Sequence, residues 1–356
     1  MTVGFYSPLP PARTGVADYS AALLKAFRAR WNVRVNRDGD INLYHLGNNQ
    51  LHAPIYRRAL ARPGVIVLHD AVLHHFMLGS LPREQYLDEF IYNYGEWSRG
   101  LAESLWRDRA RSAGDSRFFQ YPILRRIAEV SDAVVVHNPA AARMVSEHCP
   151  GARVFEIPHL YLPAELPPTV DAERLRADLG GGPLFGVFGH LRESKRVLSI
   201  LRVFRRLPEF TVLLAGEIAS SDLRRAVSEY VSGLNVRRID YMSEHTYWAA
   251  AMAVDGCINL RYPGAGETSG ISVGFMGAGK PVFITDSLEN SRYPDGTCIR
   301  ISAGLSESAE LEAVIRWAAD HRSSMREIGA SASAYIRDAH SIERVADLYA
   351  KALRLH

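Results

Sequence analysis

The stretch from Arg261 to Val282 carries more chemical information than any other part of the chain. It places one acid, Glu267, among glycines and directly before a predicted helix start. Thr268 and Ser269 have side chains that cap helices, and a capped helix start still offers free backbone amides to an anion. A carboxylate beside an anion site predicts a ligand that carries hydroxyls next to phosphates, as a nucleotide-sugar does.

A second group of candidates follows a predicted buried strand, Leu184–Phe188. Gly189 ends this strand, and the loop from His190 to Arg196 holds three bases and an acid before a predicted helix. Basic side chains between a strand end and a helix start suit a diphosphate. Lys195 is the first choice for a phosphate contact, and Arg192 and Arg196 compete for the second. A solvated loop is the alternative, since lysine and arginine normally lie at the surface.

The first half of the chain offers polar residues after two predicted strands. Gly15 permits a backbone turn near a ligand, and Asp18 is expected to cap the following helix or to hydrogen-bond an acceptor. His69 and Asp70 end the strand Val65–Leu68, and a His-Asp pair at a strand tip favours a functional role. His74 and His75 follow in a turn or helix, and one of them, with His74 as the choice for an acceptor contact, is expected to face the same site. No ligand spacing specific to a metal is present, so we expect none.

Short apolar runs alternate with amphipathic segments along the whole chain, which predicts an α/β protein with parallel sheets covered on both faces. In the first half the expected strands are Val3–Phe5, Ile41–His45, Val65–Leu68, Ala133–Val136 and Val154–Ile157, and helices are expected over Asp18–Arg30 and Pro139–His148. In the second half they are Leu184–Phe188, Thr211–Ala215, Val236–Ile239, Gly256–Leu260 and Pro281–Thr285, with helices near Val197–Leu207, Leu223–Val231, Glu244–Met252 and Ser269–Gly277.

The length of 356 residues predicts two domains. A proline-rich stretch without periodicity, 159–169, reads as a linker. We therefore expect a first domain over residues 1–162 and a second over 163–340. An amphipathic helix over 341–356 is expected to pack back on the first domain.

Composition excludes several classes of protein. The net charge of +3 is small for this length and argues against a nucleic-acid partner, which requires a basic stripe. It permits weak attraction to an anionic membrane surface. The three cysteines show no metal spacing and fit a reducing compartment. No signal peptide or membrane span is evident, so a cytoplasmic protein is expected, with peripheral contact at the inner membrane face as an option.

Taken together, these segments resemble the retaining glycosyltransferases of the GT-B fold, most closely glycosyltransferase family 4. The resemblance covers nearly the whole chain and is strongest from Phe185 to Thr285. It implies two Rossmann-like domains that face an interdomain cleft, with the donor nucleotide-sugar on the second and the acceptor on the first, and no metal or other cofactor. It further implies catalytic roles for His69, Lys195 and Glu267, donor contacts from Gly15, Gly189, His190, Arg192, Arg196, Thr268, Ser269, Gly270 and Ile271, and acceptor contacts from Asp18, Asp70 and His74.

Two residues depart from the family pattern. The arginine of the family's Gly-Arg-Leu loop is His190 here, and the second glutamate expected eight residues after Glu267 falls on Phe275 or, in a shorter segment, Gly274. The expected activity is transfer of a hexose from a nucleoside-diphosphate sugar to a hydroxyl of a glycan, polysaccharide or glycolipid acceptor, lipid-linked acceptors included. The alternatives are a nucleotide-sugar epimerase on the same fold and a catalytically impaired nucleotide-sugar-binding homologue.

Overall fold

The chain forms two units in the computed structural model, which describes residues 1–231 and 235–355. Unit 1 comprises Met1–Leu162, Pro263–Thr268 and Ala339–His356, and unit 2 comprises Pro163–Tyr262 and Ser269–Asp338. The short segment Pro263–Thr268, which the sequence boundaries place in the second domain, therefore packs with unit 1.

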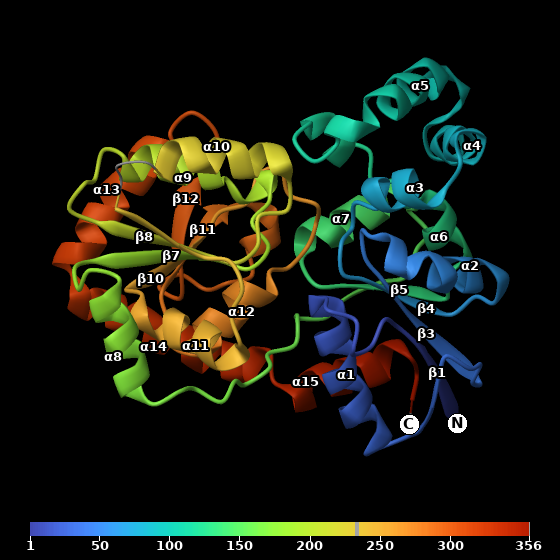
Figure 1. Ribbon diagram of the computed structural model, residues 1–356. Helices are drawn as coiled ribbons and strands as arrows, with labels where there is room; N and C mark the ends of the chain where they lie inside the picture. The colour runs from blue at the N-terminus through green and yellow to red at the C-terminus, as the bar shows by residue number, and fades with distance from the viewer. Residues whose placement is uncertain (232–234, 356) are drawn as a thin grey trace. The chain divides into compact units, whose positions relative to one another are not determined.

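Unit 1 is built on a six-stranded parallel sheet with strand order β2-β1-β3-β4-β5-β6 (Figure 1). Its strands are β1 (Thr2–Tyr6), β2 (Asn32–Val35), β3 (Ile41–Leu46), β4 (Val65–Leu68), β5 (Ala133–Val136) and β6 (Val154–Glu156). Its helices are α1 (Gly15–Arg28), α2 (Ala53–Ala61), α3 (His74–Ser80), α4 (Arg83–Tyr94), α5 (Arg99–Asp108), α6 (Arg125–Val130), α7 (Pro139–His148) and α15 (Ile342–Ala352).

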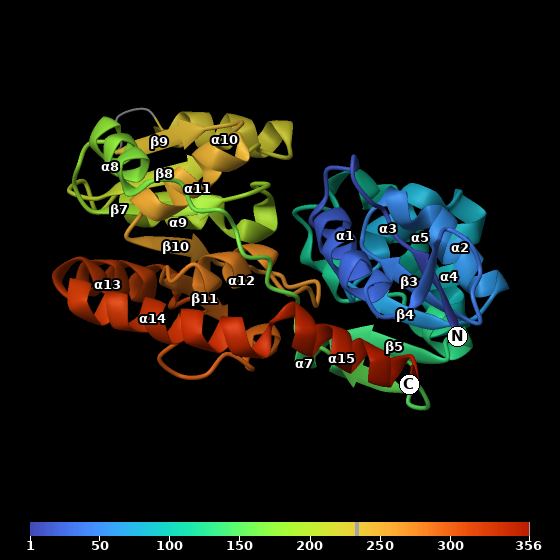
Figure 2. The same ribbon diagram turned by 90° about the horizontal axis from the view of Figure 1, so that it is seen from below.

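Alternate residues of these strands pack on opposite faces of the sheet, because successive side chains of a strand point to opposite sides. Val65 and Val67 belong to a core that includes α1 and α15, whereas Ile66 and Leu68 belong to a core with α2 to α7. On the first face, the hydroxyls of Tyr19 in α1 and Tyr349 in α15 lie 2.9 Å apart. Figure 2 shows α15 beside α1.

Unit 2 is built on a second six-stranded parallel sheet, with strand order β12-β11-β10-β7-β8-β9. Its strands are β7 (Leu184–Phe188), β8 (Thr211–Ala215), β9 (Val236–Ile239), β10 (Gly256–Asn259), β11 (Val282–Asp286) and β12 (Ile299–Ser302). Its helices are α8 (Thr169–Asp178), α9 (Val197–Phe204), α10 (Ser221–Val231), α11 (Glu244–Ala253), α12 (Gly270–Gly277), α13 (Glu307–Asp320) and α14 (Arg322–Ala339).

The prediction of an α/β fold with two Rossmann-like parallel sheets is confirmed. Unit 2 has the strand order of the doubly wound dinucleotide-binding fold, and unit 1 has the flavodoxin-like order. In such sheets ligands bind outside the carboxyl ends of the strands, where the strand order reverses. That point lies between β1 and β3 in unit 1 and between β7 and β10 in unit 2.

Two features differ from the sequence expectation. The edge strands β2 and β12 were not expected, because their side chains alternate between apolar and polar and are only partly buried. The segment from Phe76 to Gln120, which contains none of the helices expected from the sequence, includes most of α3 and all of α4 and α5. Among the described helices, none combines the length and the apolar composition needed to cross a bilayer.

Candidate functional site

The carboxyl end of β7 and the first turn of α12 meet at Gly189. This residue has a φ of +82°, which favours glycine, and a Cβ placed here would lie 2.5 Å from Cδ1 of Ile271 and 3.3 Å from Nζ of Lys195. Gly189, Lys195 and Ile271 therefore lie together at the point in unit 2 where the strand order reverses. Sequence reasoning had selected all three residues, from segments about 75 residues apart in the chain.

Lys195 is buried, although lysine is normally a surface residue. It ends a short 3₁₀ helix, η5 (Glu193–Lys195), and its ammonium donates a hydrogen bond to the backbone carbonyl of Phe188. The backbone amide of Tyr262, which follows β10, donates to the carbonyl of Ser194 at 2.8 Å. This bond connects the loop from His190 to Arg196 to the end of β10, so that Lys195 lies beside the first turn of α12.

The two competing arginines of the loop have different surroundings. Arg196 donates from Nε to both carboxylate oxygens of Glu307, at 2.9 and 3.2 Å, and its NH2 group lies 2.8 Å from the same carboxylate. Arg192 is exposed and makes no ion pair within the described residues. A ligand would meet Arg192 without breaking an internal bond, so the geometry favours Arg192 over Arg196 as a second cation. His190 is also exposed.

The first turn of α12 is organised by Ser269. Its hydroxyl accepts from the amide of Ser272 at 3.3 Å, which makes it the N-cap, and it also accepts from the side-chain amide of Asn259 at 2.8 Å. The guanidinium of Arg261 donates to the same hydroxyl at 3.3 Å. Sequence reasoning missed Arg261 as a candidate, although a base at a strand end before a helix start is the signal that selected Lys195.

The position expected to hold a second glutamate lies in an aromatic cluster. Phe275 is buried and packs against Phe188, with ring centroids 4.7 Å apart, and against Trp248. A Cβ on Gly274 would lie 3.5 Å from the ring of Trp248. Neither Phe275 nor Gly274 carries a carboxylate, and neighbouring aromatic rings enclose the ring of Phe275.

The segment that carries Glu267 is attached to the residues after β4. The amides of Ala71 and Val72 both donate to the carbonyl of Ala265, at 2.9 and 3.0 Å. Gly266 has a φ of +68°, and a Cβ here would lie 2.6 Å from Cβ of Ala71. Glycine is therefore required by both conformation and space, and the contact brings the chain before Glu267 close to the His69-Asp70 pair.

Thr268 and Glu267 are held by further hydrogen bonds within unit 1. The side-chain amide of Asn138, which caps α7, donates to the carbonyl of Gly266 at 2.9 Å and to the hydroxyl of Thr268 at 3.0 Å. The Glu267 carboxylate accepts from the amide of Ala265 at 2.8 Å. Two residues after Glu267, the chain reaches the N-cap of α12.

His69 is part of a buried cluster of aromatic rings. Its Nε2 lies 3.0 Å from Nδ1 of His45, and the two rings are stacked at 5.3 Å. Tyr19 contacts its ring edge-on at 4.8 Å, and His137 lies 5.1 Å away. Burial is the main cause that lowers the pKa of His69 and His45 well below the ordinary value, and it lowers the pKa of His137 to about 4. These rings are therefore neutral at physiological pH, and His69 can act as a hydrogen-bonding group but not as a cation.

Asp70 is half-buried and connects the residues after β3 and β4. Its carboxylate accepts from the amide of Asn48 at 2.9 Å, while the Asn48 side chain accepts from the amide of Phe76 at 2.8 Å. Asp70 thus supports the loop geometry next to His69.

The expectation that His74 contacts an acceptor is wrong, because the side chain is fully buried. His74 has no exposed surface; its Nε2 lies 2.8 Å from the hydroxyl of Tyr86, and Phe90 and Phe118 surround it. Burial lowers its pKa to about 3. His74 is a core residue of unit 1.

The start of α1 also differs in detail from expectation. Thr14, not Asp18, is the N-cap, and its hydroxyl accepts from the amide of Ala17 at 3.1 Å. Asp18 is exposed in the first helical turn. No atom beyond its chain neighbours lies within 4 Å of a Cβ placed on Gly15, so space is open in front of this residue.

Within the described residues, no group of three or more histidine, cysteine, aspartate or glutamate side chains is arranged to hold a metal ion. The histidines around His69 form a packed set of rings.

Comparison with solved structures shows which proteins share this fold. Sucrose-phosphate synthase from Thermosynechococcus elongatus is 14% identical, with a TM-score of 0.71 over 99% of this chain and 98% of that one. HepE from Anabaena, solved with UDP-glucose, is 14% identical, with a TM-score of 0.70 over 99% of both chains. WaaG, a glycosyltransferase involved in lipopolysaccharide biosynthesis, is 14% identical, with a TM-score of 0.61 over 98% of this chain and 99% of that one.

At these identities the likeness establishes the fold, which is the GT-B architecture of these glycosyltransferases. No model of a protein family matches the chain, and no curated protein matches it.

Proposed function

We propose that this protein is a retaining, metal-independent glycosyltransferase that moves a hexose from a nucleoside-diphosphate sugar to an acceptor hydroxyl. The observation that carries the proposal is the grouping of Lys195, Gly189 and the first turn of α12 where the strand order of unit 2 reverses. A buried cation beside the amino end of a helix suits a diphosphate. Solved proteins of the same fold are glycosyltransferases, and one of them was solved with UDP-glucose.

In this proposal, catalysis is mainly electrostatic. Lys195, Arg192 and the amides of Ser269, Gly270 and Ile271 stabilise the charge that develops on the leaving diphosphate, while Gly15, Gly189 and His190 lie near the donor. Preorganised donors of this kind are usually the largest catalytic contribution, and loss of one costs roughly 2.7–4 kcal/mol.

Sugar recognition is assigned to the segments that unit 1 holds together. Glu267 accepts hydrogen bonds from the hydroxyls of the donor sugar, and neutral His69 binds the sugar near the bond that breaks. Thr268 follows Glu267 at the donor, and Asp18 and Asp70 lie on the acceptor side. The acceptor oxygen attacks on the face that the diphosphate leaves, and the leaving phosphate takes its proton, so no covalent nucleophile is needed.

The acceptor is proposed to be a glycan or a lipid-linked glycan, in a biosynthetic role in the cytoplasm, with peripheral contact at the inner membrane face as an option. Because α12 has no glutamate, the ribose contact is proposed to come from other residues. The epimerase alternative is not favoured, since the similar solved structures are transferases.

The test is release of the nucleoside diphosphate from UDP-, ADP- and GDP-hexoses, with thermal shift as a screen for donor binding. Lys195→Met and Glu267→Gln are each expected to lower kcat/KM by about 10²–10³. Arg202→Gln, an exposed arginine of α9, is the matched control. Unchanged turnover in both site variants would overturn the assignment of roles, and donor binding without transfer or hydrolysis would favour the impaired homologue.

A further inference from the structure

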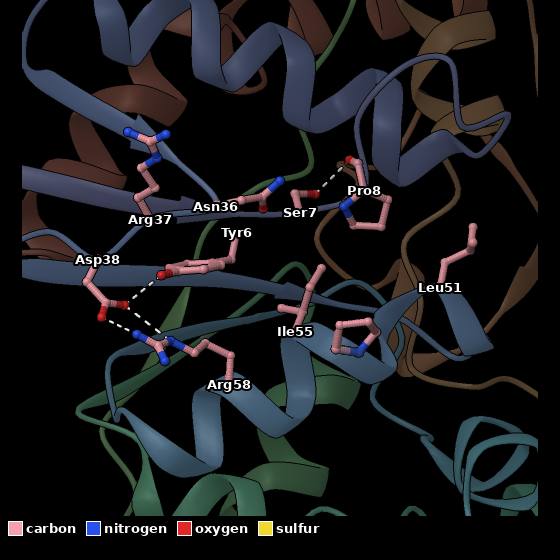
Figure 3. Close-up of a pocket in the computed structure, with 10 residues that line it drawn as sticks. Tyr6, Ser7, Pro8, Asn36, Arg37, Asp38, Leu51, Ile55 and Arg58 are labelled. Carbon is pink, nitrogen blue, oxygen red and sulfur yellow. Dashed lines mark hydrogen bonds and ion pairs between the residues drawn. The ribbon is translucent and has the colours of Figure 1, made fainter.

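Unit 1 contains a pocket with both polar and apolar walls at the end of β1, which the proposed chemistry does not use (Figure 3). Its volume is about 650 Å³, within the range of pockets that bind small ligands. The lining comes from β1 and the loop after it, from the connection between β2 and β3, and from the region of α2. The residues are Tyr6, Ser7, Pro8, Asn36, Arg37, Asp38, Leu51, Pro54, Ile55 and Arg58.

The pocket owes its shape to an unusually short connection between parallel strands. Parallel neighbours normally need a crossover of a dozen or more residues, but here only residues 36–40 join β2 to β3 across β1. The close approach requires glycine at two positions: a Cβ on Gly4 would lie 2.7 Å from the carbonyl oxygen of Arg37, and one on Gly39 would lie 2.4 Å from the amide nitrogen of Gly4. The segment Asp38-Gly-Asp40 lies in this connection.

Within the pocket the charges of Asp38 and Arg58 neutralise each other, and Arg37 leaves a net positive charge. The carboxylate of Asp38 accepts from the hydroxyl of Tyr6 at 2.6 Å and forms an ion pair with Arg58. The hydrogen bond from Tyr6 is the first cause that lowers the pKa of Asp38, so this acid is ionised at neutral pH. Polar groups on one side, together with Pro8 and Ile55 on the other, suit a neutral ring with hydroxyls on its edge.

A second hollow adjoins the first at Arg37 and has a different charge. It has a volume of about 420 Å³ and is lined by Arg28, Arg34, Val35 and Arg37. None of these three arginines forms an ion pair within the described residues, and no acid lines the hollow. Three guanidinium groups without an internal partner suit a carboxylate, sulfate or phosphate.

We propose that the two hollows form one subsite for an acidic saccharide, with a neutral sugar unit in the pocket of Tyr6, Asn36 and Arg58 and the anionic group of the adjacent unit against Arg28, Arg34 and Arg37. The pocket lies at the end of β1, beside the point where the strand order of unit 1 reverses, which is where such sheets bind ligands. That this saccharide is the acceptor rests on the proposed glycosyltransferase activity. That the subsite binds it does not depend on that activity.

The experiment is calorimetric titration of the full chain with trigalacturonic acid and with maltotriose, a neutral trisaccharide. The acidic trisaccharide is expected to bind at least about tenfold more tightly, and its affinity should fall by about tenfold or more in Arg34→Gln/Arg37→Gln. Arg107→Gln/Arg111→Gln is the matched control in unit 1, because it removes two exposed arginines that line neither hollow. Equal affinity for the two trisaccharides, or an equal loss in the control, would overturn the proposal.

Two further measurements separate a saccharide from other anions. Asn36→Gly removes a side-chain amide from the pocket at a φ of +52°, which glycine adopts without strain, and should weaken trigalacturonic acid but not inorganic phosphate. Binding of phosphate as tight as that of the trisaccharide would overturn the saccharide assignment. So would binding to phosphatidylglycerol vesicles that the double variant abolishes, since this would identify a lipid headgroup as the ligand.

Failure of the subsite and failure of the activity give different results. If trigalacturonic acid binds as expected but no nucleoside diphosphate is released from any donor, the subsite stands and the proposed function fails. If donor turnover occurs but the acidic trisaccharide does not bind, the function stands and the subsite fails.

Discussion

Arg196 and Arg192 are four residues apart, and removal of either should reveal which one serves the fold and which one serves a ligand. Arg196 makes a bidentate contact with Glu307, whose side chain is only 3% exposed, while the Arg196 side chain is 29% exposed. Arg192 is exposed and has no ion-pair partner within the described residues. We expect Arg196→Met to destabilise the protein and Arg192→Met to lower donor turnover.

The magnitude follows from the charge that each substitution leaves behind. Breaking a fully buried ion pair from one side costs about 3–5 kcal/mol, because the remaining charge is buried without compensation. Since Arg196 is partly solvated, we expect about 2–4 kcal/mol for Arg196→Met, on the same grounds. Arg192→Met should change the free energy of unfolding by less than about 0.5 kcal/mol, as exposed substitutions usually do.

The assay is urea denaturation of the two variants, of Glu307→Met and of Arg196→Met/Glu307→Met, together with donor turnover. The double variant should be more stable than the sum of the single losses, because it buries no unpaired charge. Turnover of folded Arg196→Met should stay near that of the parent, whereas Arg192→Met should lose about tenfold or more, the scale of a lost charged hydrogen bond. An Arg196→Met variant with parental stability and lost donor affinity would refute the reasoning.

Three further predictions concern the fold around the candidate site. The histidines packed around His69 have folded-state pKa values below the ordinary value of about 6.5, with His52 and His137 at about 4. The unfolded chain therefore takes up protons first as the pH falls, so the free energy of unfolding should be complete above pH 6.5 and should decrease between pH 6.5 and 4. The urea midpoint should decline over this range, and a constant midpoint would contradict the prediction. Gly189→Ala should lower the free energy of unfolding by about 1–3 kcal/mol, since it forces a side chain to a φ of +82° against Ile271. Gly15→Ala, with open space around it, should leave the free energy of unfolding unchanged. Equal urea midpoints for the two variants would count against this geometry. His74→Ala should lower the free energy of unfolding by about 2–5 kcal/mol with kcat/KM of the folded protein retained, and a selective loss of kcat/KM would restore His74 as a site residue.

Central strands of this fold can be predicted from the sequence with close boundaries. The central strands β4, β5, β7 and β8 begin and end at the predicted residues, and so does the edge strand β9. In all but β9 this is because continuous apolar runs mark strands buried on both faces. The edge strands β2 and β12 lack that signal, since residues such as Arg34 and Arg300 interrupt them and one face meets solvent.

Candidate site residues could be selected from the sequence, but their partners could not. A base after a strand and a glycine with an acid before a helix are local signals, and they identified Lys195 and Glu267. The pairing of Arg196 with Glu307 and the attachment of Ala265 to Ala71 join residues more than 100 positions apart. The burial of His74 likewise depends on Tyr86 and Phe118, and the sequence around these two residues does not indicate that they contact His74.

The packing of α15 on unit 1 has a consequence for synthesis of the chain. Val345, Tyr349 and Leu353 complete the core on one face of the first sheet, yet they are translated after the whole of unit 2. Until then, the nascent first 162 residues lack this cover, and the hydroxyl of Tyr19 lacks its partner. Unit 2 can therefore reach its folded state while unit 1 still exposes an apolar face, so a chaperone that binds apolar surface is expected to retain the nascent chain until α15 emerges.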